Sequence, residues 1–352
     1  MSSIVHERPG VYSSYDASML VRRGTASKVV GVAAQAAQGD TDQVTLVTSY
    51  EGGLAAFGAD EEGQAMAELL RLLFLNGVTA VRAVRVADGG SYGDAFDLLS
   101  MEEDIQVVVC DSGELTVQQL LRTSLESASA ARRERIGVVG SSGEDVSALI
   151  TRAEGLNSER MVLVGPDVTD EGGEARSGVF AAAAVAGVIA ASGDPAVPLN
   201  GVELQGLGGV GVRYSDNDID LLVRGGVTPL EAVGGVVSPV RGITTRTKTG
   251  GSADATWREL TTILIVDDVI PAVRSALRSR FTRTKNTLQT RGAIRSQVIV
   301  ELENKVAAQI IDSYGEVSVE ADSVDPTVCL VEFSFAVSHG LNQIYLTAHI
   351  TV

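Results

Sequence analysis

Cysteine and histidine are scarce in this chain of 352 residues. Cys110 and Cys329 are the only cysteines, too few for a disulfide framework, and a chain of this length buries enough apolar surface without one. We expect both to be reduced, buried thiols. The three histidines, His6, His339 and His349, do not lie with Cys, Asp or Glu at metal-ligand spacing. The sequence therefore predicts neither a disulfide-stapled module nor a metal site.

Long apolar runs are also absent. Residues 1–10 show no basic stretch followed by an apolar segment, so the sequence predicts no signal peptide and a protein that is made and kept in the cytoplasm. The longest apolar run, residues 179–191, is mostly alanine and falls short of the roughly 20 residues that a membrane-spanning helix requires. We expect no membrane segment and interpret this run as a closely packed buried helix.

Positive charge is in short supply. Lys and Arg number 28 against 45 Asp and Glu, and the net charge of −17 repels nucleic acid. The few cations are unevenly placed, because residues 271–295 contain several and no acid. Such a basic island on an acidic protein indicates a docking surface for an acidic partner, whereas the ordinary alternative is a solvated helix face. Its members are Arg274, Arg278, Arg280, Arg283, Lys285, Arg291 and Arg295.

Familiar catalytic motifs are missing. The chain has no P-loop and no G-x-S-x-G nucleophile elbow. Residues 206–211 match G-x-G-x-x-G, but a dinucleotide site requires a strand before the motif, a helix after it and an acidic residue about 20 positions further on. The residues that follow, 213–216, are predicted as strand or turn. We therefore interpret this segment as a flexible glycine loop.

The chain does contain an alternation of apolar runs and helical patterns between residues 78 and 191. Short, nearly continuous apolar runs are typical of parallel strands that are buried on both faces and joined by helical crossovers. The predicted strands are residues 78–86, 105–110, 136–140 and 161–165, and the predicted helices are residues 60–75, 114–130 and 144–154. The first helix ends at Asn76-Gly77, a good stop signal. We expect a small α/β layer here.

This layer also permits an enzymatic or nucleotide-binding interpretation. Ligands of such sheets bind beyond the carboxyl ends of the strands, where residues 110–113, 140–143 and 165–167 supply Asp, Ser and Gly. The same residue types end strands and cap the next helix, and no conventional base accompanies them. A soluble α/β enzyme or nucleotide-binding protein is therefore the alternative to a structural protein.

After residue 194 the sequence changes to Gly, Pro and Thr with short apolar pieces, which indicates a loose domain boundary. Further on we predict a strand at residues 260–266 and a helix from Ile270-Pro271, capped by Asp267 and Asp268. A final internal strand is predicted at residues 327–337. Apolar residues at helical spacing form a stripe along this helix, and a second stripe predicts another helix after it. The first stripe consists of Ile270, Leu277, Phe281 and Leu288. The second consists of Ile294, Val298, Leu302, Val306 and Ile310.

Both ends of the chain are predicted to be extended. In the last residues apolar and polar side chains alternate to the end of the sequence, as in a strand. Near the N-terminus a Pro-Gly pair precedes another extended stretch. Strands in these positions need a sheet edge to pair with. The residues of the two arms are Pro9, Gly10, Val11, Tyr12, Ile344, Leu346, Ala348 and Ile350.

Several segments together resemble the contractile tail sheath family, in particular its short members in simple phage tails and phage-tail-like bacteriocins. Residues 7–12, ERPGVY, resemble the opening R-P-G-V-Y of sheath subunits. Residues 257–270 and 279–286 resemble the C-terminal domain, and residues 324–326 with 341–352 resemble its last strands. The middle, roughly residues 52–228, resembles the variable α/β region. The order and placement of these segments carry the resemblance.

The resemblance implies an α/β fold: a small α/β layer plus an α+β C-terminal domain, with extended N- and C-terminal arms that add strands to neighbouring subunits. The implied divisions are an N-terminal arm at residues 1–24, a variable α/β region at 25–227, a C-terminal sheath domain at 228–340 and a C-terminal arm strand at 341–352. In such sheaths, subunits stack as hexameric rings around a tail tube, and the heterologous contacts propagate as an open helix.

The implied function is that of a structural subunit that contracts to drive the tube through a target cell envelope. It is not an enzyme and uses no cofactor or metal. The implied partners are further copies of itself, the tail tube protein, and the baseplate and tail terminator proteins, with no nucleic acid and no membrane. Assembly is expected in the bacterial host cytoplasm. The residues expected to face the tube are Arg274, Arg278, Arg280, Arg283 and Lys285.

Overall fold

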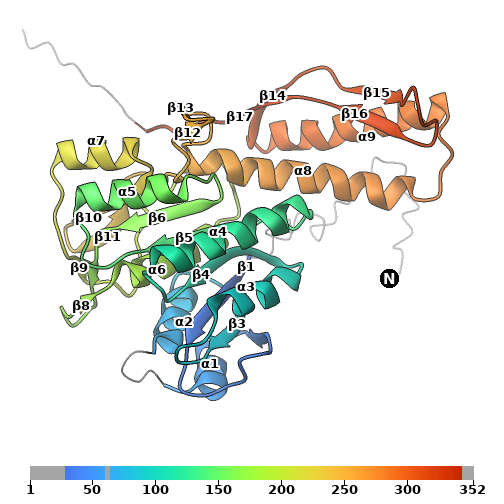
Figure 1. Ribbon diagram of the computed structural model, residues 1–352. Coiled ribbons are helices and arrows are strands. Elements are labelled where there is room, and N and C mark those ends of the chain that lie inside the picture. Colours follow the sequence, from blue (N-terminus) through green and yellow to red (C-terminus); the bar gives the residue numbers. More distant parts are fainter. Residues whose placement is uncertain (1–27, 60–63, 343–352) are drawn as a thin grey trace, which may run out of the picture.

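The protein consists of a large twisted sheet with helices on both faces and a smaller unit of long helices and strands that extends to one side of it (Figure 1). The computed structural model describes residues 28–59 and 64–342. The predicted arm residues, in the segments 1–27 and 343–352, lie outside these described residues. The α/β class expected from the sequence is confirmed.

Parallel strands form the middle of the large sheet, and an antiparallel strand lies at each edge. The parallel strands are β1 (Val29–Gln35), β3 (Val81–Val86), β4 (Ile105–Cys110), β5 (Ile136–Gly140), β6 (Met161–Gly165) and β10 (Val227–Val233), and the edge strands are β2 (Thr45–Val47) and β11 (Val236–Pro239). Their order is β11-β10-β6-β5-β4-β1-β3-β2. Three predicted strands have the observed bounds, and the first begins at Val81 rather than at residue 78.

The strands β1, β2, β10 and β11 were not predicted from the sequence, and of these β1 lies between β3 and β4. Val32 is in register with Ala83 on one side and with Val109 on the other. Residues 30–34 are all buried. A short apolar run without alternation does not distinguish a strand from a buried helix. The sheet therefore begins well upstream of the alternating region between residues 78 and 191.

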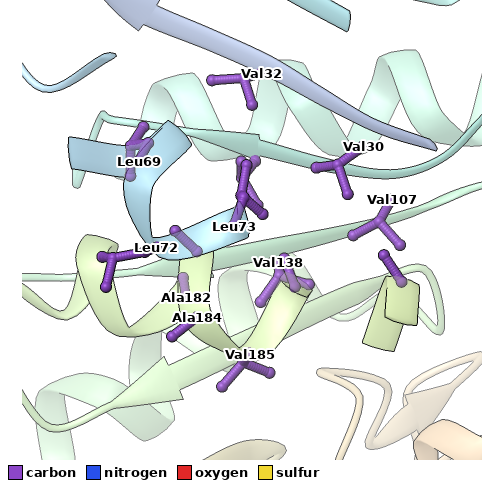
Figure 2. Close-up of a cluster of buried hydrophobic side chains, with 14 of the residues drawn as sticks. Val30, Val32, Leu69, Leu72, Leu73, Val107, Val138, Ala182, Ala184 and Val185 are labelled. Carbon is purple, nitrogen blue, oxygen red and sulfur yellow. The ribbon is translucent and has the colours of Figure 1, made fainter. Parts of the chain in front are cut away.

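Two helices, α2 (Met66–Leu75) and α6 (Gly178–Ala191), cover one face of the large sheet and pack against each other. Figure 2 shows leucines of α2 and small side chains of α6 meeting valines of the sheet. A Cβ at Gly187 would lie 2.7 Å from the Cβ of Asn76, so glycine permits this close approach. The buried alanine-rich helix predicted at residues 179–191 is confirmed.

The opposite face of the sheet is covered by α3 (Tyr92–Met101), α4 (Leu115–Ala130), α5 (Val146–Leu156) and α7 (Asp216–Arg224). Each of these helices contributes a fully buried side chain to a second core, for example Phe96, Leu121, Leu149 and Leu222. The predicted helices at residues 114–130 and 144–154 correspond to α4 and α5. On the first face, α1 (Tyr50–Phe57) packs against α2.

The glycine-rich segment 206–211 lies against a small hairpin. It contains β9 (Gly209–Val210), which pairs with β7 (Val168–Thr169), whose other neighbour is β8 (Ala175–Arg176). A Cβ at Gly208 would lie 2.2 Å from the carbonyl oxygen of Asp170, so this glycine permits backbone contact. The strand or turn predicted at residues 213–216 is wrong in part, because Ser215 forms a capping box that starts α7 at Asp216.

Residues 260–266, predicted as a strand, form the first turns of the long helix α8 (Leu260–Phe281). Their β-branched residues favour a strand by local propensity, but tertiary packing buries Leu260, Ile263 and Val269 at helical spacing. Pro271, predicted to open this helix, lies inside it, where it removes one backbone hydrogen bond. Packing therefore overrides both local signals.

The smaller unit is a helical hairpin, α8 with α9 (Leu288–Ala307), that carries a hairpin of strands (Figure 1). The strands are β14 (Ile311–Tyr314), β15 (Ser318–Ala321), β16 (Cys329–Glu332) and β17 (Phe335–Val337). β14 pairs with β17 and β15 pairs with β16, all antiparallel. Residues 311–337 thus form one long interrupted hairpin, which we call the long hairpin.

Several sequence predictions for this unit need correction. Leu288 starts α9 and is 81% exposed, so the apolar stripe of α8 ends at Phe281. In α9, Val298 and Leu302 are fully buried as expected, but Ile310 lies beyond the end of the helix. The strand predicted at residues 327–337 is divided into β16 and β17. Cys329 is a half-buried free thiol, whereas Cys110 is buried as predicted.

Between the two units lies a short hairpin of β12 (Lys248–Thr249) and β13 (Ser252–Ala253). The domain limit expected between residues 227 and 228 falls within β10. β10 pairs with β6 and with β11, so the large sheet continues to Pro239. The sheet therefore contains residues on both sides of the expected limit.

Candidate assembly surface

The end of the α8–α9 hairpin that points away from the large sheet carries exposed cations (Figure 1). Arg278 lies in the last turn of α8, where a cation also interacts favourably with the carbonyl end of the helix. Arg283 and Lys285 lie in the connection to α9, and Arg283 has a left-handed backbone with φ of 66°. All three are exposed. We call these three residues the basic tip.

Two of the predicted tube-facing residues have side-chain partners in the described part of the chain. Arg274 is in an ion pair with Glu134, which follows α4, with 2.6 Å between Nη2 and Oε1. Hydrogen bonds to Glu134 raise the pKa of Arg274. Arg280 donates to Gln297 of α9. The structure therefore places four of the five residues at this end of the hairpin, with Arg280 engaged by α9, whereas Arg274 holds α8 against the α/β layer.

An acidic turn lies beside the basic tip. The Asn286 side-chain nitrogen donates to the carbonyl oxygens of Pro326 and Val328, at 2.9 and 3.0 Å, and so ties the α8–α9 connection to the β15–β16 turn. That turn contains Asp322 and Asp325, whose pKa values are lowered by hydrogen bonds from the turn itself. The sequence window 271–295 contains no acid, but the fold places two about 40 residues away in the chain next to it.

The long hairpin presents two unpaired strand edges. Among the described residues, β14 pairs only with β17 and β15 only with β16. Side chains on β16 and β17 alternate, with Val331, Phe333, Phe335 and Val337 turned toward the helices α8 and α9. A strand edge without a partner exposes backbone donors and acceptors in a row. This surface is therefore suited to accepting strands from other chains.

The carboxyl ends of the strands of the large sheet, where the enzymatic alternative would place a ligand, are used within the fold. The switch in strand order lies at β1, between β3 and β4, and Asp111 is located there. Its carboxylate accepts the Tyr92 hydroxyl at 2.6 Å and the Gln35 amide at 2.8 Å. Burial raises the pKa of Asp111, and these hydrogen bonds oppose that shift. The carboxylate serves as an internal support.

The same holds for the ends of β5 and β6. The Asp167 carboxylate accepts the amides of Gly143 and Gly178, at 2.7 and 2.8 Å. A Cβ at Gly140 would lie only 2.1 Å from the carbonyl oxygen of Gly178, so the start of α6 is packed directly on the end of β5. These contacts leave the Asp, Ser and Gly residues of the strand ends engaged in capping and packing.

Within residues 28–59 and 64–342, no group of three or more His, Cys, Asp or Glu side chains is placed to hold a metal ion. No helix in the same ranges is long and apolar enough to cross a membrane. The basic tip and the edges of the long hairpin remain as candidate contact surfaces in this part of the chain.

The geometry defines an α/β protein whose helical hairpin carries open strand edges, and comparisons with known proteins show the family that has this fold. Family models match in two places: the phage tail sheath protein central domain at residues 86–245 and the phage tail sheath C-terminal domain at residues 252–351. The chain belongs to the contractile tail sheath family.

Individual relatives place the match in context. The tail sheath protein of Bacillus phage SP01 is 30% identical over 266 residues, which cover 74% of this chain and 45% of that protein. The chain thus spans less than half the length of this relative. A sheath tail protein from Desulfitobacterium hafniense has a TM-score of 0.70 at 11% identity and covers 93% of this chain and 100% of its own. A chain of the contracted helical sheath of the anti-feeding prophage has a TM-score of 0.72 at 16% sequence identity. The match covers 98% of this chain and 99% of that chain. At these low sequence identities, the two structural similarities show a shared fold only.

Proposed function

We propose that this chain is the structural subunit of a contractile tail sheath, in which copies stack as hexameric rings around a tail tube. Contraction of the stack drives the tube through a target cell envelope. The observation that carries the proposal is the long hairpin, whose two outer edges have no partner among the described residues. One face of the hairpin packs on α8 and α9, but its outer strand edges leave backbone donors and acceptors open, so this surface can accept further strands.

The arms at residues 1–24 and 341–352 are the proposed source of those strands. Main-chain hydrogen bonds supply the strength of such a pairing, and the alternating side chains supply its register. An arm that enters the sheet of a neighbour makes a heterologous contact, which propagates along a helix instead of closing into a dimer. Subunits connected in this way remain attached while their folded bodies rotate.

The basic tip is the proposed contact with the tube. Arg278, Arg283 and Lys285 are exposed and engage no acid in the described part of the chain. An acidic tube surface matches them, and exposed charge pairs give register and reversibility rather than great strength. The acidic turn beside the tip restricts the matching surface, because the tube must avoid Asp322 and Asp325.

The other proposed partners are the baseplate and tail terminator proteins, with no role for nucleic acid, membrane or catalysis. Assembly takes place in the bacterial host cytoplasm, and the product is a phage tail or a phage-tail-like particle. Support for the baseplate comes from fold relatives, among them a chain of the anti-feeding prophage baseplate with a TM-score of 0.72 at 16% identity.

Electron microscopy tests the proposal directly. The purified full chain, alone and co-expressed with its tail tube protein, is imaged in negative stain. We expect rings or striated tubes, and extended striated sheaths in the presence of the tube. A compact monomer at all concentrations, together with nucleotide binding in calorimetry, would instead support the α/β enzyme.

A further inference from the structure

Both ends of the described chain are fastened to one short segment. The amide of Lys28, the first described residue after the N-terminal arm, donates to the carbonyl oxygen of Ala190 at 3.0 Å. At the other end, the Asn200 side-chain nitrogen donates to Asn342 at 2.8 Å. Residues 190–200 span at most about 35 Å even when fully extended. The roots of the two arms therefore lie along one stretch of chain.

The contact at the C-terminal root is tight. A Cβ at Gly340 would lie 2.9 Å from Cγ and 3.0 Å from Cβ of Pro198. Only glycine lets the backbone lie this close to the proline ring without displacement. The neighbouring Leu341 is 74% exposed, so the contact is made by the backbone rather than by an apolar side chain. The chain leaves the long hairpin along a defined path.

The same segment connects the two units of the protein. Leu199 is buried in the core on the α2–α6 face, whereas Ala196 packs against the core of the α8–α9 unit. The amide of Gly201 donates to the carbonyl oxygen of Pro239 at 2.9 Å, which holds the segment to the edge strand β11. Residues 190–200 are thus anchored in both units.

The side chain of Lys28 adds a charged link between this segment and α8. It lines a cavity of 380 Å³ together with Asp104, Glu134, Asp267 and Asp268, and its ammonium has no hydrogen-bond partner in the described structure. Asp267 already pairs with Arg160, and Asp268 with Lys305. Asp194, within the segment, also acts on Lys28 electrostatically. The Lys28 ammonium is therefore a cation without an ion-pair partner of its own among the described residues, and it lies between residues 190–200 and α8.

We propose that residues 190–200 and Lys28 form a hub that joins the roots of the two arms and fixes the direction in which each arm leaves the subunit. A force applied to one arm is then transmitted to the other arm through residues 190–200. It is transmitted to α8 through the charged groups that line the cavity at Lys28. The proposal rests on the proposed function only for the role of the arms, since the hub itself is a property of the single subunit.

A disulfide at the C-terminal root tests the hub. The variant Pro198→Cys with Gly340→Cys is made in a Cys329→Ser background, because Cys329 is the half-buried free thiol. A Cβ at Gly340 lies 3.0 Å from Cβ of Pro198, which is about half an ångström shorter than the disulfide range, so a small outward shift of the backbone allows the bond. We expect mild oxidation to link them almost completely in the unassembled subunit, as measured by mass spectrometry. The matched control, Gly340→Cys with Gly292→Cys, is expected to stay reduced, since nothing lies within 4 Å of a Cβ at Gly292.

The outcomes separate the hub from the proposed function. If the 198–340 disulfide does not form, or if oxidised subunits fail to polymerise where reduced ones succeed, the root is not held on the segment during assembly and the hub is wrong. If the disulfide forms and neither the variant nor the wild type ever polymerises, the hub stands and the proposed function fails. We expect oxidised and reduced subunits to polymerise to the same extent.

Amide exchange of the wild-type subunit provides a second test that requires no substitution. The amide of Lys28 donates to Ala190, so we expect it to exchange about 100-fold or more slowly than the same amide in an unstructured peptide. Exchange at the unstructured rate would show that the N-terminal root is free, and the hub would then lose one of its two anchors.

Discussion

The α/β layer and the C-terminal unit differ in how completely each buries its own surface. The large sheet has helices on both faces, and its two cores contain many side chains with no exposure at all. The C-terminal unit has one core of seven buried residues, and most of the apolar side chains around it are only partly buried. Among the described residues, the layer buries most of its own apolar surface, whereas the C-terminal unit leaves much of its apolar surface partly exposed.

Deletion of residues 344–352 is expected to have the most different effects on the two regions. We expect complete loss of polymerisation, because the terminal strand is proposed to pair with the open edge of a neighbouring hairpin. The α/β layer should remain folded, since the buried residues of its two cores all lie between Val30 and Ile263. Electron microscopy and circular dichroism of the truncated chain measure the two effects. Normal sheaths from the truncated chain would remove the arm from the assembly.

Reversal of the exposed charges tests the tube contact of the C-terminal unit. The variant changes Arg278, Arg280, Arg283 and Lys285 to Glu. We expect no extended sheath on the tube, while contracted polymers without a tube still form, because three of these cations have no side-chain partner among the described residues and Arg280 donates only to Gln297 of α9. In the wild type this contact should weaken with salt, as the screening length falls from about 8 Å at physiological ionic strength to roughly 3 Å at 1 M.

The matched control for this reversal changes exposed cations of the α/β layer, Arg213 and Arg224, to Glu. Extended sheaths should form normally from that control. Normal extended tails from the quadruple variant would place the tube contact elsewhere and make the basic tip an ordinary solvated end of a helical hairpin.

Paired core truncations compare the packing of the two regions. Leu72→Ala in α2 should lower the free energy of unfolding by about 4 kcal/mol, because the site is surrounded by fixed helices and strands. Leu302→Ala in α9 should cost only about 2 kcal/mol, since the half-exposed side chains nearby relax into the space. Urea unfolding of both variants, with Leu46→Ala as the exposed control, gives these values. Equal losses would contradict the difference in packing.

The smallest expected effect concerns Lys28, at the boundary of the two regions. Burial lowers the pKa of Lys28, and Asp268, Asp267 and Asp194 oppose the shift. The unfolded chain therefore binds more protons between the lowered value and 10.5, so stability contributed by this group rises with pH across that window. Asp104 and Glu134 line the same cavity.

Replacement of Lys28 by Met should remove this pH dependence and raise the stability at pH 7 by about 1 kcal/mol, because a buried unpaired polar group is lost. Thermal unfolding between pH 7 and pH 11 measures both effects. The control is Lys248→Met, which breaks an exposed pair with Glu154 and should change little. A Lys28→Met variant less stable than the wild type would mean that the acids around the cavity depend on its charge.

The strands β4, β5 and β6 were predictable because burial on both faces leaves a continuous apolar run that ends at turn residues. The strand β1 is also a short apolar run, but no helical pattern precedes it. The alternation of apolar runs with helical patterns therefore did not indicate a strand there. Residues 260–266 have β-branched side chains and still form helix, because α8 must span two cores. The need to pack against two separate cores cannot be predicted from the local sequence of residues 260–266.

For the candidate surface, the count of cations predicted the basic tip, but only the fold shows which of them are free. Arg274 has its acidic partner, Glu134, 140 residues earlier in the chain. The acids of the β15–β16 turn are likewise distant in sequence and adjacent in space to the tip. Pairing between distant residues depends on the packing of complete elements, and no local pattern encodes it.

The helix α8 has a consequence for how the protein unfolds. Leu260 and Ile263 at its start belong to the core of the α/β layer, whereas Ile265, Val269 and Val273 belong to the core of the C-terminal unit. Melting of this helix exposes apolar surface of both regions at once. Heat should therefore denature the two regions in one cooperative transition, with a single calorimetric peak, despite the difference in their packing.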